Sequence, residues 1–125
     1  MKKIIVSKNA PNPIGPYSQA VIKGNMLFVS GQIAINPANG DLMTGDIKTE
    51  AKQVMENLKG ILTDAGFDFS HVCKSTIFMK DLNDFATVNE MYGSYFSGDY
   101  PARETVQVSK LPLNVNVEIS VIAVK

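Results

Sequence analysis

The sequence predicts an α+β fold in which two α-helices pack on one face of a mixed β-sheet. Three observations indicate this fold. Two segments carry apolar residues at spacings of three and four, several short segments alternate apolar and polar residues, and 125 residues suit one domain. The predicted order is β-β-β-α-β-α-β-β, and residues 1–125 are expected to form a single domain.

Three strands are expected before the first helix. Residues 2–6 are a short apolar run, and residues 17–23 and 26–35 have the composition of strands. The two longer segments are joined at Gly24 and Asn25, residue types that are typical of tight turns. The second and third strands are therefore predicted to form a hairpin.

The first helix is predicted over residues 47–65, where one apolar stripe recurs at helical spacing. Asp46 suits the N-cap, because a short acidic side chain can accept a hydrogen bond from a free backbone N–H of the first turn. Gly66 suits the position just beyond the helix, where a left-handed backbone is common. Residues 72–80 follow as a β-rich strand.

The second helix is predicted to begin near Asn83 or Asp84 and to end before Gly98. Its apolar stripe consists of Phe85, Val88, Tyr92 and Phe96. Residues 105–109 and 115–124 are expected to be the last two strands. Both stripes are interpreted as faces that pack into the core.

The last predicted strand has one face that is fully apolar and another that is half apolar. The fully apolar face consists of Val115, Val117, Ile119, Val121 and Ala123. The other face consists of Asn116, Glu118, Ser120, Ile122 and Val124. Because the two helices can cover only the first face, we expect a second copy of the chain to cover the other.

The composition argues against several classes of protein. Twelve basic residues balance twelve acidic ones, so the strongly basic face of a nucleic-acid binder is not expected. No apolar run has the length of a signal peptide or a membrane span, so no membrane partner is expected. Cys73 is the only cysteine, so no disulfide within the chain is expected. Together these observations predict a cytoplasmic protein. With His71 as the only histidine, no metal site is predicted.

Arg103 is the only arginine in the chain. Its planar guanidinium can bind a carboxylate or phosphate through two parallel hydrogen bonds, which lysine cannot do. Pro101 stiffens the chain before it, so the side chain is expected to leave from a fixed position. A structural ion pair with Glu104 or Asp99 is the alternative interpretation.

Glu118 is a carboxylate in the middle of a strand whose neighbours on the same face include Ile and Val. Glutamate is rarely buried unless it is paired, and a carboxylate in such a place is a candidate acid or base. Exposure at a sheet edge, or an ion pair with Lys110, is the alternative.

Three further residues are weaker candidates. Tyr17 follows a rigid Gly-Pro turn and places a phenol where it can reach a ligand, although most such tyrosines belong to the core. Gly31 lies inside a predicted strand, which often marks close approach by another backbone or a ligand. Asn89 lies beside the apolar stripe of the second helix, where an ordinary surface asparagine is the default interpretation.

Four segments resemble the Rid family of reactive imine and enamine deaminases, and most closely its RidA branch. They are "IGPYSQAV", "VSGQI", "DFATVNEMY", and "PARETVQVSKLP" followed by "VEI". They occur in the same order as in the family and together run through essentially the whole chain. The arginine followed at the right distance by Val-Glu-Ile is the most specific of them.

The resemblance implies a chorismate-mutase-like fold, assembled as a homotrimer with a small 2-imino or 2-keto acid bound in clefts between subunits. It implies hydrolysis of 2-aminoacrylate and related enamines, through their imine tautomers, to 2-keto acids and ammonia, without a cofactor. Such species leak from pyridoxal-phosphate enzymes. A non-catalytic trimer that binds small carboxylates, and a translation-inhibitory ribonuclease, are the alternatives.

The resemblance also implies roles for single residues. Arg103 matches the arginine that binds the substrate carboxylate, and Glu118 matches the glutamate that positions or activates water. The implied substrate-binding residues are Tyr17, Ser30, Gly31, Asn89 and Thr105. Thr105 stands where many relatives have cysteine, and Glu104 stands where many have a small residue. On an extended chain Glu104 should point away from the face that carries Arg103.

Overall fold

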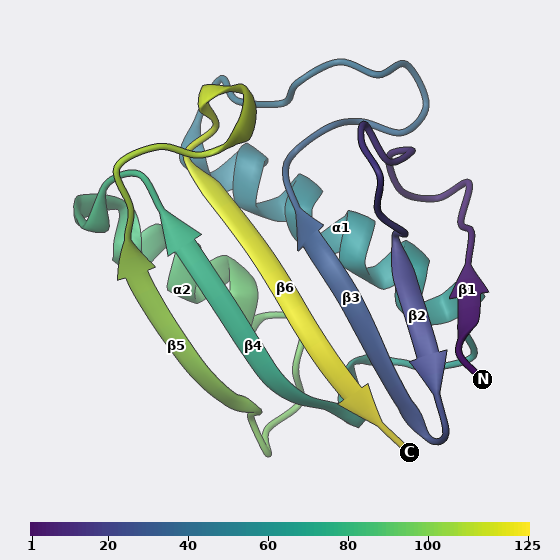
Figure 1. Cartoon of the computed structure of the whole chain (residues 1–125). Helices are drawn as coiled ribbons and strands as arrows, with labels where there is room; N and C mark the ends of the chain where they lie inside the picture. Colours follow the sequence, from purple (N-terminus) through teal and green to yellow (C-terminus); the bar gives the residue numbers. More distant parts are fainter.

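The computed structural model describes residues 1–125 as one mixed sheet covered by two α-helices (Figure 1). The sheet order is β1-β2-β3-β6-β4-β5. The strands are β1 (Lys3–Ile5), β2 (Ala20–Lys23), β3 (Met26–Gln32), β4 (Val72–Met79), β5 (Ala102–Gln107) and β6 (Val117–Val124). The helices are α1 (Ile47–Asp64) and α2 (Phe85–Gly93), with short 3-10 turns at Phe69–His71, Leu82–Asp84 and Pro112–Asn114.

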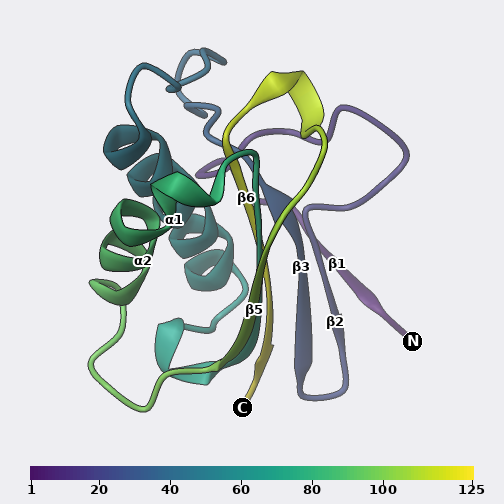
Figure 2. The ribbon, with the colours of Figure 1, turned by 90° about the vertical axis from the view of Figure 1, so that its left-hand side faces the viewer.

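The predicted element order and fold class are confirmed. β4 and β5 are the one parallel pair, and the other neighbouring strands are antiparallel. A parallel pair needs a crossover connection, and α2 supplies it. Both helices lie on the same side of the sheet (Figure 2), which leaves the other side of the sheet without a helical layer.

The signals at the ends of α1 act as predicted. The backbone N–H of Thr49 donates to the Asp46 carboxylate at 2.9 Å, which satisfies one of the free donors of the first turn. Gly66 follows the C-cap with a φ of 81°, a left-handed backbone that glycine adopts without strain. The apolar stripe of α1 packs on the sheet. Large side chains buried between the layers include Leu27, Leu58, Ile61, Ile77 and Ile119.

The first residues of β6 are fixed to α1 by a buried carboxylate. The Glu50 side chain has no exposed surface. It accepts hydrogen bonds at 2.7 Å from both the backbone N–H and the side-chain amide of Asn116, and at 3.2 Å from the backbone N–H of Val117. The alternation in β6 also follows the prediction, because the residues from Val117 to Ala123 that face the helices are buried and those between them are half-buried.

Some predicted boundaries are wrong. Tyr17 lies in a loop, and β2 begins three residues later at Ala20. The cause is the buried Gln19 side chain, whose amide group bonds to the backbone of Ser7, Ala10 and Pro11 and so holds the preceding segment as a loop.

Strand β5 begins at Ala102 rather than Thr105, because its first residues pair with β4 from Lys74 onward. β3 ends at Gln32 and α2 at Gly93, both earlier than predicted. None of the helices has the length and apolar character that crossing a membrane requires.

Candidate active site

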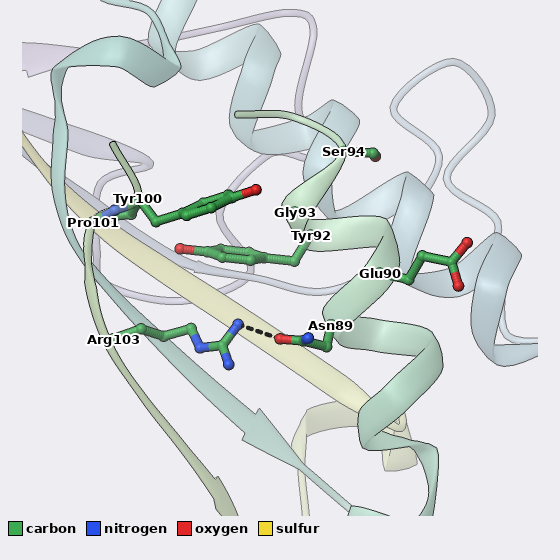
Figure 3. Close-up of a pocket in the computed structure, with 8 residues that line it drawn as sticks. All are labelled: Asn89, Glu90, Tyr92, Gly93, Ser94, Tyr100, Pro101 and Arg103. Carbon is green, nitrogen blue, oxygen red and sulfur yellow. Dashed lines mark hydrogen bonds between the residues drawn. The ribbon is translucent and has the colours of Figure 1, made fainter. Parts of the chain in front are cut away.

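Arg103 lies on β5, directly beside Ser75 of β4, on the side of the sheet that faces α2. Its Nη1 donates to Oδ1 of Asn89 at 2.8 Å (Figure 3). The Cζ atom lies 5.1 Å from the centre of the Tyr92 ring and 5.6 Å from that of Phe85. Both distances are within the range of cation–π contacts. The arginine is therefore held by one amide and two aromatic rings.

No carboxylate neutralises Arg103. The alternative of an ion pair with Glu104 or Asp99 is wrong, because Glu104 pairs with Lys74 at 3.1 Å and Arg103 forms no ion pair. Glu104 also accepts from the hydroxyl of Thr76, which places it away from Arg103, as the alternation of an extended strand predicts. The guanidinium thus has no ionic partner within the chain and can pair with an anionic ligand.

An open cavity of about 730 Å³ begins at Arg103 and continues along the end of α2. In Figure 3 the Tyr92 ring lies above the guanidinium and the Tyr100 ring lies above that of Tyr92, whereas the carboxylate of Glu90 points away from Arg103. The lining residues are Asn89, Glu90, Tyr92, Gly93, Ser94, Tyr100, Pro101 and Arg103. Such a hollow offers a cation and aromatic walls to a small acid.

Glu118 lies on the opposite side of the sheet, between the buried residues Val117 and Ile119 of β6. Its side chain lies against Gly31, where the register of β3 against β6 shifts. A Cβ atom on Gly31 would lie only 2.8 Å from Cδ of Glu118. Gly31 is therefore a point of close approach, but the approaching group is a carboxyl side chain rather than the backbone or ligand that the sequence suggested.

The Glu118 carboxyl has no hydrogen bond or ion pair within the chain, so a pair with Lys110 is not formed. Partial burial raises the pKa of Glu118, because leaving water disfavours its charged form. A carboxyl group with a raised pKa and free oxygens can take a proton from water and return it, which is the chemistry of a general base and acid.

Tyr17 and Ser30 lie near Gly31. Tyr17 is half exposed, its hydroxyl oxygen accepts from the backbone N–H of Ile14 at 3.4 Å, and it lines a small hollow together with Gly31. The Ser30 hydroxyl donates to the backbone carbonyl of Ser18 at 2.6 Å. Ser30 therefore ties the loop that carries Tyr17 to β3, and its hydroxyl oxygen can still accept a hydrogen bond.

Thr105 lies two residues after Arg103 on β5, opposite the buried Ile77, and so on the same side of the strand as Arg103. Its Oγ1 atom is buried and has no hydrogen-bond partner. A buried hydroxyl without a partner is uncommon in native structures. No three histidine, cysteine, aspartate or glutamate side chains gather in one place, so we assign no metal ligands.

One chain assembles the predicted site residues into two groups. Arg103, Asn89 and Thr105 belong to the side of the sheet that carries the helices, whereas Glu118 projects from the other side, next to Gly31. None of the five main cavities of the single chain is lined by both Arg103 and Glu118.

The sequence does not identify Phe85 and Tyr92 as contacts of Arg103, because aromatic residues at helical spacing are typical of a core-facing stripe. Tyr92 belongs to the core as well, whereas Phe85 is 39% exposed. The signal was the position of Asn89, which lies four residues after Phe85 and three before Tyr92 and therefore shares their helix face.

The chain is therefore an α+β domain with an unneutralised arginine on one side of its sheet and an unpaired glutamate on the other, groups that can bind a small acid and exchange protons. Residues 7–125 match the model of the family described as Endoribonuclease L-PSP. The 2-iminobutanoate/2-iminopropanoate deaminase of Mus musculus is 47% identical over 100% of this chain and 93% of its own.

Solved structures agree with this match. A member of the conserved Rid protein family from Yersinia pestis has a TM-score of 0.97, 46% identity and full coverage of both chains. E. coli TdcF, crystallised with bound serine, has a TM-score of 0.94 and 44% identity over 98% of each chain. The chain belongs to the Rid/YjgF (L-PSP) family.

Proposed function

We propose that this protein hydrolyses small 2-imino acids, which arise from enamines such as 2-aminoacrylate, to 2-keto acids and ammonia. The observation that carries the proposal is the unneutralised Arg103, held in place by Asn89 and open to a cavity. The full-length deaminase of Mus musculus supports this reaction, and the serine bound to E. coli TdcF supports a ligand of amino-acid size with one carboxylate.

In the proposed reaction Arg103 binds the carboxylate and so fixes the position of the neighbouring C=N carbon. Glu118 takes a proton from water as the water oxygen bonds to that carbon and the C=N electron pair moves to nitrogen. Glu118 then returns the proton to nitrogen, the C–N bond breaks with its electron pair leaving on ammonia, and the C=O bond forms as Glu118 takes the hydroxyl proton and passes it to that ammonia. Water and iminium are thereby converted to keto acid and ammonium. The raised pKa of Glu118 suits these transfers.

We further propose that the complete site forms between subunits of a homotrimer. Arg103 and Glu118 lie on opposite sides of the sheet in one chain, so a second copy must bring a glutamate to each arginine. The face of the sheet without helices supplies a surface for this contact. It carries the 41%-exposed Phe28 directly opposite Ile122 of β6, and exposed apolar patches of this kind mark protein contacts.

Mixing two inactive variants tests the shared site. Arg103→Ala subunits still contribute Glu118, and Glu118→Gln subunits still contribute Arg103, so trimers formed by refolding them together contain some intact pairs. We expect activity to reappear in the mixture and sedimentation to give a trimer. A stable monomer, or trimers that stay inactive after mixing, would count against the shared site.

The hydrolase itself is tested with Arg103→Ala and Arg103→Lys. Loss of a buried charged partner typically costs about 2–5 kcal/mol, which is roughly 30-fold to several thousand-fold in rate. We expect both variants to release ammonia far more slowly from 2-aminoacrylate generated in situ by a pyridoxal-phosphate dehydratase. Lys74→Ala is the matched control, because Lys74 is a cation on the adjacent strand that pairs only with Glu104. Wild-type rates in both Arg103 variants would rule out this function.

A non-catalytic carboxylate-binding trimer would use the same arginine, so binding alone does not separate it from the hydrolase, and turnover does. The family description also names an endoribonuclease. Balanced charge and a single arginine argue against extensive phosphate contacts. The nuclease would be favoured instead if the wild type cleaves RNA and if Arg103→Ala and Glu118→Gln each abolish that cleavage.

A further inference from the structure

Three residues on one face of α2 contact Arg103. Phe85, Asn89 and Tyr92 are separated by four and three positions, and this spacing places them on the same side of a helix. Asn89 accepts a hydrogen bond from Nη1, and the two rings lie within cation–π distance of Cζ. The first helical turn, the second turn and the end of α2 thus all touch the same guanidinium.

Tyr92 is itself fixed from the sheet. Its side chain is 4% exposed, and its hydroxyl donates to Oγ of Ser75 at 2.8 Å. Ser75 is fully buried and is the β4 residue paired with Arg103. The ring therefore has no freedom to move away from the arginine without breaking a buried hydrogen bond. Phe85, by contrast, is 39% exposed and makes its contact from the surface.

The hydrogen bond to Asn89 leaves a defined set of donors free. Nη1 is bonded, whereas Nε and Nη2 have no acceptor within the chain. These two nitrogens form one edge of the planar guanidinium, and their N–H bonds are parallel. A carboxylate binds best to such an edge, because its two oxygens match the two donors.

We propose that Phe85, Asn89 and Tyr92 are positioning residues for Arg103, which fix the plane and rotation of the guanidinium so that its Nε–Nη2 edge receives a planar carboxylate. This inference rests on the proposed function only in that the ligand is a carboxylate. The inference gives α2 a second role that its apolar stripe alone does not predict, because the same helix packs against the core and orients the Arg103 guanidinium.

Arginine side-chain NMR tests the inference without a ligand, because the single arginine gives one unambiguous set of guanidinium signals. A guanidinium held at Nη1 and between aromatic contacts rotates slowly, so we expect separate ¹⁵N resonances for Nη1 and Nη2 in the wild type. They should merge into one averaged signal in Asn89→Ala and broaden or merge in Phe85→Leu. A single averaged signal in the wild type would overturn the inference.

Ligand binding gives a second test, with 2-oxobutanoate as the probe. We expect Phe85→Leu to raise the dissociation constant about 3- to 30-fold, the range for loss of one cation–π contact. Tyr92→Phe keeps the ring over Cζ but removes its bond to Ser75, so it should raise the dissociation constant, by less than Phe85→Leu does. Tyr95→Leu is the matched control, because Tyr95 is an aromatic residue just beyond α2 that bonds to Glu56 and does not touch Arg103.

The outcomes separate this inference from the proposed function. Unchanged affinity in both Phe85→Leu and Asn89→Ala, or an equal loss in Tyr95→Leu, would overturn the positioning role, as would a wild type that does not bind 2-oxobutanoate. If the wild type binds 2-oxobutanoate and the variants weaken binding as expected, but the wild type shows no turnover, the positioning role would be supported and only the proposed hydrolase activity would be ruled out.

Discussion

Replacing Gly31 by alanine is expected to displace Glu118 without disturbing the fold. The added Cβ would lie 2.8 Å from Cδ, 3.0 Å from Cγ and 3.1 Å from Oε1 of Glu118, whereas carbon atoms in contact normally lie about 3.5–4.0 Å apart. The carboxyl group must therefore move by about 1 Å. Gly31 is not among the residues with positive φ, so alanine adopts the same backbone without strain.

The displacement should appear mainly in catalysis. A misplacement of about 1 Å can lower a rate on the order of 100-fold, so we expect ammonia release from 2-aminoacrylate to fall by about that factor. The pKa of Glu118 should also fall towards its ordinary value, because burial is what raises it. Since the deprotonated carboxylate is the base in the proposed reaction, the acid limb of the pH–rate profile should move to lower pH.

Gly45→Ala is the matched control, since a Cβ atom at Gly45 meets nothing within 4 Å. It should keep the wild-type rate and pH profile. Thermal melts of both variants separate displacement of Glu118 from general unfolding. Full activity and an unchanged acid limb in a folded Gly31→Ala protein would refute the reasoning, because the carboxyl group would then not need the space that glycine leaves.

Two further predictions concern stability. The raised pKa of Glu118 means that the folded state holds the carboxyl proton more tightly than the unfolded state, so the stability that protonation provides is fully present below the ordinary glutamate pKa and is lost as pH rises through the raised value. Glu118→Gln should therefore have a higher melting temperature than the wild type at pH 8 but not at pH 4. An equal difference in melting temperature at both pH values would contradict this. Glu50→Ala leaves three N–H donors without an acceptor, namely the backbone and side-chain amides of Asn116 and the backbone amide of Val117. At about 1 kcal/mol or more each, denaturant titration should show a loss of roughly 3 kcal/mol, and a loss below about 1 kcal/mol would contradict it.

The fold was predictable where one periodic pattern decides the structure. The stripe of α1 and the alternation of β6 specify buried faces, and Asp46 and Gly66 mark the ends of α1 through backbone chemistry that acts locally. The start of β2 was not predictable, because Tyr17 and Ser18 suit a strand by composition. The buried Gln19 amide holds them as a loop through bonds to residues about ten positions earlier, which no local pattern expresses.

The candidate site was predicted from residues that depart from their surroundings. Arg103 stood out as a single guanidinium and Glu118 as a carboxylate among apolar neighbours, and the structure leaves both without an ionic partner. Phe85 and Tyr92 could not be identified from their own spacing, because a ring that fills the core and a ring that supports a cation give the same pattern; only the helix face that they share with Asn89 marks them. Only the crossover from β4 to β5 brings that helix face to Arg103.

The parallel pairing of β4 and β5 has an evolutionary consequence. Arg103 and the side chains that contact it all come from the continuous segment 72–107, because the crossover helix that joins the two strands also surrounds the arginine. Glu118 and Gly31, by contrast, come from distant parts of the chain. Recombination within this family could therefore exchange the proposed acid-binding half as one continuous segment, whereas no single short segment carries both Glu118 and Gly31.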